Sequence, residues 1–133
     1  MKTSRRSLVR AAAGLFQGKR VRLYLVEGER AYVRAGSAKE DVQDKVSLTI
    51  ADSVLADAFR RGKTMQVDNY SGHTAGVRPT SIAPLMRDGK AIGAITVPRT
   101  EPGILSEKQM ALLRTFADQA VIAIENVRLF DEV

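Results

Sequence analysis

A predicted β-hairpin with two apolar faces constrains the fold most strongly. Residues 81–87 and 90–97 flank Asp88-Gly89, a dipeptide typical of two-residue hairpin turns because both turn residues need positive φ. Neither face can be left in water, so we expect other elements to cover both sides. If Arg87 pairs with Lys90, one face carries Ile82, Pro84, Met86, Ala91, Gly93, Ile95 and Val97, and the other carries Ala83, Leu85, Ile92 and Ala94.

Pro84 limits the neighbours of this hairpin. It lacks a backbone N–H and donates nothing to a β-ladder. On the side of Pro84 that faces away from Gly93, we therefore expect the ladder to end, to bulge or to meet a sheet edge.

A second hairpin is predicted over residues 21–26 and 30–35, where apolar and polar positions alternate. We expect a three-residue loop, 27–29. It places the pairs Leu25 with Ala31 and Leu23 with Val33 on one face, and Tyr24 with Tyr32 and Arg22 with Arg34 on the other. The two tyrosines between two arginines could stack on a planar ligand, although a solvated hairpin face has the same composition. Short strands are expected at 46–50 and 64–67, and irregular connections at 37–45 and 68–76.

Three helices are predicted, over residues 4–17, from Asp52 or Ser53 to Gly62, and from Ser106 to about residue 132. Ser106 and Gln109 have the spacing of a capping box. At about 1.5 Å per residue the last helix is about 40 Å long, so its end should project past the sheet.

The last predicted helix has two apolar stripes. Its apolar positions form a heptad seam, Met110, Leu113, Ala117, Ala120, Ile124 and Val127, beside a second stripe, Leu112, Phe116, Ala123 and Phe130. One stripe suffices to pack the helix on a sheet, so the second needs the first helix or another subunit.

Composition excludes several classes of function. The chain has no cysteine, which removes disulfides, thiolate nucleophiles and zinc ribbons and suggests a reducing, cytoplasmic setting. With a single histidine, His73, we expect no metal site. No apolar run approaches the roughly 20 residues that cross a bilayer, so we expect no membrane insertion by this domain. The 21 Lys and Arg residues exceed the 15 acidic ones but are dispersed, so we expect no nucleic-acid partner.

Residues 81–97 together with residues 105–130 resemble the carboxyl-terminal half of a GAF domain. The likeness is to the versions in bacterial sensor histidine kinases and nucleotide-cyclase signalling proteins. Phe-Ala-Asp-Gln-Ala at 116–120 and Ala-Ile-Glu-Asn at 123–126 resemble the exit helix of those domains. The resemblance implies an α+β, GAF/PAS-like fold, with an antiparallel sheet of five or six strands, terminal helices on one face and a ligand pocket on the other. It also implies that residues 1–133 are one domain of a larger multidomain signalling protein.

The resemblance covers several ligand classes, and this sequence departs from most of them. Family members bind cyclic nucleotides, tetrapyrroles, haem or small metabolites, and some only dimerise. The cyclic-nucleotide signature is absent because Asn126 is followed by Val127. Covalent bilin attachment and the family's methionine-sulfoxide reductases need cysteine, which excludes both in their usual form. Haem bound through His73 is not expected, and the cofactor is left unknown.

Five polar residues lie in or beside the predicted loop at the expected mouth of that pocket: Asp68, Asn69, Tyr70, His73 and Arg78. Together they could recognise an anionic or hydrogen-bonding ligand. An ordinary polar turn has the same composition. We expect no catalytic residues here, because no nucleophile stands at a recognisable spacing.

These observations predict a regulatory domain that senses a small molecule and forms a homodimer through its terminal helices. The residues assigned to the dimer and signalling helix are Leu112, Leu113, Phe116, Ala120, Ile124 and Val127. Two alternatives stay open. One is a ligand-free dimerisation module. The other is a small-molecule enzyme that uses loop 68–78, for which the sequence offers no cysteine, paired carboxylates or metal cluster.

Overall fold

The computed structural model describes residues 21–36, 47–67, 80–98 and 106–131. Its centre is a six-stranded antiparallel sheet in the order β3-β2-β1-β6-β5-β4. The strands are β1 Arg22–Glu27, β2 Arg30–Gly36, β3 Ser47–Thr49, β4 Met65–Val67, β5 Thr80–Arg87 and β6 Lys90–Pro98. The described helices are η1 Ile50–Asp52, α3 Leu55–Arg61 and α4 Glu107–Asp131. The α+β class and the number of strands are as predicted. The predicted helix 4–17 and the predicted connections 37–45 and 68–76 lie outside the described residues.

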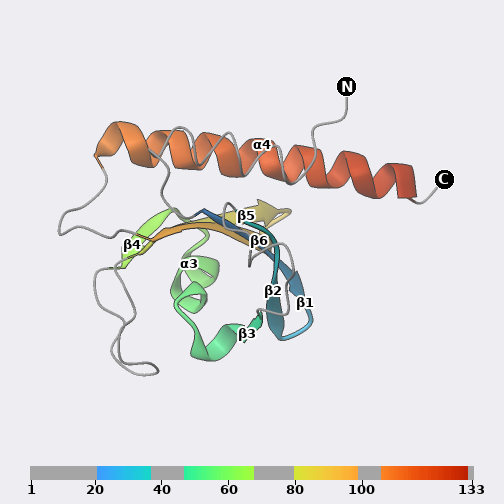
Figure 1. Ribbon diagram of the computed structural model, residues 1–133, viewed down its shortest axis with the longest axis horizontal. Helices are drawn as coiled ribbons and strands as arrows, with labels where there is room; N and C mark the ends of the chain where they lie inside the picture. Colours follow the sequence, from blue (N-terminus) through green and yellow to red (C-terminus); the bar gives the residue numbers. More distant parts are fainter. Residues whose placement is uncertain (1–20, 37–46, 68–79, 99–105, 132–133) are drawn as a thin grey trace.

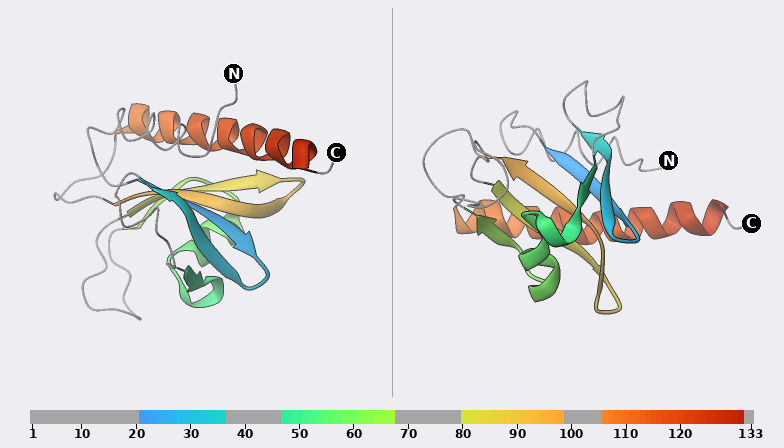
Figure 2. Two further views of the ribbon diagram at one scale, coloured as in Figure 1. Left: turned by 45° about the vertical axis from the view of Figure 1, so that its right-hand side comes forward. Right: turned by 90° about the horizontal axis from the view of Figure 1, so that it is seen from below.

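Helices cover both faces of the sheet, as the two apolar faces of the 81–97 hairpin require (Figure 1). The long α4 crosses one face and packs chiefly on β5, while the short α3 lies against the other (Figure 2). The last turns of α4 extend past the sheet. None of the described helices is long and apolar enough to cross a membrane.

The β5–β6 hairpin closes through the predicted turn, because Asp88 and Gly89 both adopt positive φ. The predicted assignment of its faces is wrong beyond the first pairs. Met86 still pairs with Ala91, but Leu85 pairs with Gly93, so Ile92 is an extra, bulged residue. One extra residue reverses the alternation of side chains on that strand. The α4 face therefore receives Ala83, Leu85, Ile95 and Val97, and the α3 face receives Ile82 and Ala94.

The β1–β2 hairpin corrects two further expectations. Its turn has two residues, Gly28 and Glu29, rather than three, because Gly28 adopts a φ of 64° that closes the shorter connection. A register shift then makes Arg34 an extra residue on β2. The predicted pairs are consequently replaced by Leu25 with Tyr32, Tyr24 with Val33 and Leu23 with Ala35.

Of the three predicted helix starts, the two that lie in the described residues are confirmed by hydrogen bonds. The Leu55 N–H donates to Ser53 Oγ at 3.1 Å before α3. At α4 the capping box is complete, since the Gln109 N–H donates to Ser106 Oγ at 3.1 Å and the Ser106 N–H donates to Gln109 Oε1 at 2.9 Å. The predicted stop of α3 is also confirmed, because Gly62 is left-handed and its N–H donates to the Ala58 carbonyl at 2.8 Å.

The sheet separates two apolar cores. On the α4 side, the buried helix residues Leu113, Ala117 and Ala120 pack on strand residues that include Leu23 and Leu85. The α3 side is built from Tyr24, Ala31, Val33, Leu55, Ala58, Ile82 and Ala94. Because α4 contributes directly to the larger core, its position depends on how that core is packed.

Candidate functional site

A cavity of about 540 Å³ lies between α4, β5 and the connection from α3 to β4. Among the described residues, its lining combines three charged side chains with one threonine and four small or apolar residues. The lining residues are Gly62, Lys63, Thr64, Pro84, Met86, Arg114, Ala117 and Asp118.

The cavity follows from the early end of one ladder. β4 pairs with β5 only from Thr80 to Ile82, so this ladder stops before Pro84, as the missing N–H of that proline predicts. The α3–β4 connection starts at Gly62, where a Cβ would lie 3.4 Å from Met86 Cε. The space between this connection, β5 and the overlying α4 is the cavity.

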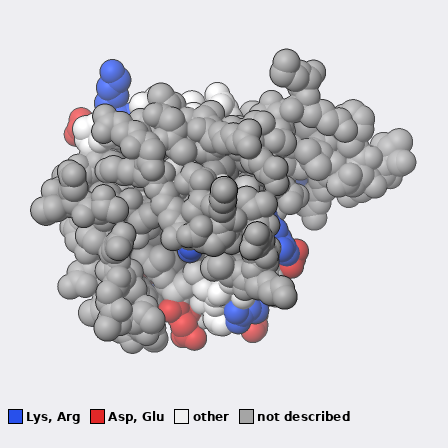
Figure 3. All heavy atoms as spheres, viewed as in Figure 1, with Lys and Arg blue, Asp and Glu red and all other residues white. Residues whose placement is uncertain are grey.

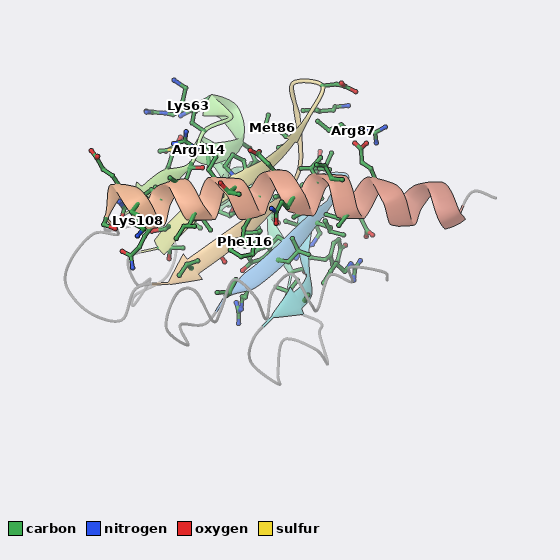
Figure 4. All side chains as sticks on the ribbon, turned by 90° about the horizontal axis from the view of Figure 1, so that it is seen from above. Lys63, Met86, Arg87, Lys108, Arg114 and Phe116 are labelled. Carbon is green, nitrogen blue, oxygen red and sulfur yellow. The ribbon has the colours of Figure 1, made fainter. Side chains whose placement is uncertain are left out.

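The charges around the cavity are available to a ligand. Lys63, Arg114 and Asp118 are exposed, and among the described residues none of their side chains forms an ion pair or hydrogen bond. Other charged side chains are paired with each other. Arg87 Nε lies 2.8 Å from Glu125 Oε1, and Arg60 forms an ion pair with Asp57. In Figure 4, Lys63, Met86 and Arg114 lie on one side of α4 and Phe116 on the other.

A smaller polar group lies on the α3 face of the sheet. Arg22 Nη1 donates to the Tyr24 hydroxyl at 3.5 Å, and Arg22 is paired in the ladder with Thr96. Tyr24 and Thr96 are only 6% and 5% exposed. These polar side chains lie at one end of the α3-side core, where β1 begins and β6 ends.

The predicted aromatic stacking site on β1 and β2 is not formed. Tyr24 contributes to the α3-side core, whereas Tyr32 pairs with Leu25, which packs on the α4-side core. The tyrosines are on opposite faces because the two-residue turn shifts the register by one. Arg34 instead lies 4.8 Å from the centre of the Tyr32 ring and forms an ion pair with Glu27 at 3.0 Å.

The five predicted ligand residues, Asp68, Asn69, Tyr70, His73 and Arg78, lie outside the described residues, so this site stays a prediction. Of the residues assigned to the signalling helix, Leu113 and Ala120 are buried within the chain's own core, whereas Leu112, Phe116 and Ile124 are half-buried. The side chain of Val127 is outside the described part. The described residues contain no group of three or more His, Asp or Glu side chains arranged to hold a metal ion.

Sequence reasoning did not find the cavity residues. Lys63, Met86 and Arg114 come from three segments far apart in the chain, so no local motif joins them. Two local features mark parts of the cavity, namely the end of α3 at Gly62 and the end of the β4–β5 ladder before Pro84. Neither feature indicates that α4 lines the third side of the cavity.

Several solved structures resemble this fold, and GAF domains are among them. The GAF domain of an Acinetobacter phosphoenolpyruvate-protein phosphotransferase superposes with a TM-score of 0.79 and 20% identity, covering 96% of this chain and 84% of that one. The GAF domain of a two-component sensor histidine kinase from Bacillus halodurans gives 0.75 and 14%, covering 96% and 98%. A type II free methionine-R-sulfoxide reductase from Thermoplasma acidophilum gives 0.71 and 19%, covering 91% and 92%.

At these identities the likenesses show the fold alone. No curated protein sequence matches the chain. The model of the GAF domain family matches residues 6–125, which is nearly the whole chain. The chain therefore belongs to the GAF domain family.

Proposed function

We propose that this chain is a regulatory domain of a bacterial signal-transduction protein, such as a sensor histidine kinase. In this proposal it senses a small molecule in the cytoplasm, forms a homodimer through its terminal helices and has no catalytic activity of its own. Membership of the GAF family supports a signalling role. The fold shared with the GAF domain of the Bacillus halodurans sensor kinase is compatible with that kind of parent protein.

The proposal rests on one observation: α4 is packed in the core over part of its length and extends past the sheet at its end. Leu113, Ala117 and Ala120 anchor this helix in the larger core, while its last turns extend past the sheet (Figure 1). A change in the packing of the core should therefore move a helix that extends past the sheet. A shift or rotation of a packed helix is a common way to pass a signal between domains.

The proposed dimer contact lies on the second stripe of α4. Leu113 and Ala120 are already buried within the chain, so the contact is assigned to Leu112 and Phe116. Phe116 also packs against the chain's own core, whereas Leu112 is half-buried without belonging to either described core. Leu112 is therefore the residue whose substitution tests the contact with the least damage to the fold.

Sedimentation equilibrium at micromolar concentration tests the dimer. We expect twice the 14.5 kDa monomer mass for the unmodified chain and a monomer for Leu112→Glu, because a charge would be buried at the contact. Ile122→Glu is the matched control, since Ile122 lies on the same helix and is 61% exposed. A monomeric unmodified chain, or equal dissociation by both variants, contradicts the proposal.

Native mass spectrometry of the purified chain separates sensing from dimerisation alone. A retained small molecule supports the sensory role. A dimer that retains nothing and binds no metabolite supports the ligand-free module instead. The fold shared with the Thermoplasma reductase does not favour an enzyme here, because this chain has no cysteine for thiol chemistry.

A further inference from the structure

We propose that the cavity beside α4 binds a small organic acid that also carries an ammonium group. Lys63 and Arg114 hold its acidic groups, and Asp118 accepts hydrogen bonds from its ammonium. The inference deepens the proposed sensory role and rests on it for its biological meaning. The binding itself can be measured without any signalling output.

The size and floor of the cavity suit a small metabolite. A volume of about 540 Å³ falls within the range of about 300–1,000 Å³ that is usual for small-molecule sites. The half-buried Met86 supplies most of the apolar surface for the carbon skeleton of a ligand, because Pro84 and Ala117 line the cavity but are buried. Thr64 adds a hydroxyl that can donate or accept a hydrogen bond.

Charge complementarity selects the class of ligand. The described residues of the lining carry two cations and one anion, and none of these three side chains is paired within that part of the chain. A ligand with two carboxylates and one ammonium matches these charges one for one. A simple dicarboxylate leaves Asp118 facing a like charge, which lowers its affinity.

The cations and the anion approach the cavity from two sides. Arg114 and Asp118 are one helical turn apart on α4, whereas Lys63 lies on the α3–β4 connection. A ligand that contacts all three bridges the helix and the connection. Since Ala117 between the two α4 charges is buried in the larger core, such a bridge acts directly on the helix that we assign to output.

The open, exposed position of these charges implies weak binding. Ion pairs in contact with water each contribute little, so we expect a Kd between about 0.1 and 1 mM. Amide chemical shifts of the ¹⁵N-labelled chain, followed during a titration with L-glutamate as the probe, are suited to this range. Succinate, which lacks the ammonium, is the comparison ligand.

We expect L-glutamate to cause saturable shifts at Lys63, Thr64, Arg114 and Asp118. Lys63→Gln and Arg114→Gln should each weaken its binding by about three- to tenfold. Asp118→Asn separates the two ligands, because it should weaken L-glutamate and strengthen succinate. Lys108→Gln is the matched control. Lys108 is another exposed cation on α4 that does not line the cavity, and its replacement should leave both affinities unchanged (Figure 4).

Three results overturn the site. They are the absence of saturable shifts at these residues, equal weakening by Lys108→Gln and Arg114→Gln, and succinate binding as tight as that of L-glutamate. A monomeric chain that still binds L-glutamate contradicts the proposed dimer but leaves this site intact. A dimer that responds to another small molecule while failing to bind L-glutamate overturns this site and leaves the proposed function standing.

Discussion

The two hairpins of the sheet have the same kind of turn and bulge, but their tips make different contacts. Each closes through a two-residue turn that contains a glycine with positive φ, and each has one bulged residue. The tip of β5–β6 is tied to the helix above it, because Arg87 pairs with Glu125 of α4. In the β1–β2 hairpin the ion pair is internal, because Glu27 next to the turn pairs with Arg34 of the same hairpin. We infer that β5–β6 couples the sheet to α4 and that β1–β2 is the more independent unit.

Where the hairpins meet, a substitution should have the largest effect. Gly93 of β6 pairs with Leu25 of β1, and a Cβ on Gly93 would lie 2.3 Å from the Tyr24 carbonyl oxygen. Because the obstacle is backbone, Gly93→Ala must force the strands apart, and we expect a loss of about 3 kcal/mol or more in unfolding free energy. Urea denaturation checks this value. A loss below about 1 kcal/mol would show that the hairpins tolerate separation.

The two turns allow a direct comparison of local strain. Gly89 and Gly28 have φ values of 77° and 64°, and an added Cβ meets nothing within 4 Å at either position. Gly89→Val and Gly28→Val should therefore each cost about 1–3 kcal/mol from backbone strain alone. The β5–β6 variant should also shift the amide signals of α4 near Glu125, and the β1–β2 variant should not. Identical patterns of α4 shifts would refute the coupling through Arg87.

Deleting a bulged residue should be tolerated better than deleting its neighbour. Arg34 is the extra residue between the pairs Tyr24 with Val33 and Leu23 with Ala35, so its deletion keeps Val33 and Ala35 on their native faces. We expect a loss of about 1 kcal/mol, from the ion pair with Glu27 and the contact with Tyr32. The matched deletion of Val33 moves Arg34 into the α3-side core and should abolish cooperative thermal unfolding. Equal losses would mean that the bulge is misplaced.

Breaking the tie between β5–β6 and α4 should have the smallest effect on stability. The Arg87–Glu125 pair is partly exposed, so Arg87→Gln should lower the unfolding free energy by at most about 1 kcal/mol. Hydrogen exchange should nevertheless quicken at the hairpin tip and around Glu125. Glu27→Gln is the control in the other hairpin, and it should change exchange only within β1–β2. Unchanged exchange near Glu125 in Arg87→Gln would remove the distinction between the hairpins.

The charges elsewhere on the described surface are mixed. In Figure 3, the visible Lys and Arg atoms lie beside Asp and Glu atoms at several places and do not gather into one basic patch. Most of that face belongs to residues outside the described part. The absence of a nucleic-acid partner therefore stays a prediction from the dispersed charges in the sequence.

The element order was largely predictable, whereas the faces and the cavity were not. Every described strand was expected within one or two residues, as were α3 and α4; the short η1 was not expected. Assigning residues to faces failed in both hairpins, because strict alternation holds only without an extra residue. For the candidate site, the predicted ladder break at Pro84 was confirmed, but the cavity lining needed the relative positions of three distant segments.

Local chemistry explains what the sequence by itself determined. The Asp88-Gly89 turn, the caps at Ser53 and Ser106 and the stop at Gly62 each depend on conformations and hydrogen bonds within a few residues. The positions of the two bulges depend instead on which side chains pack into the α4-side core and which into the α3-side core. Only the assembled sheet, with both cores in place, determines them. The cavity has the same origin: α4 covers the edge that β4 leaves open, and no segment of the chain encodes that contact alone.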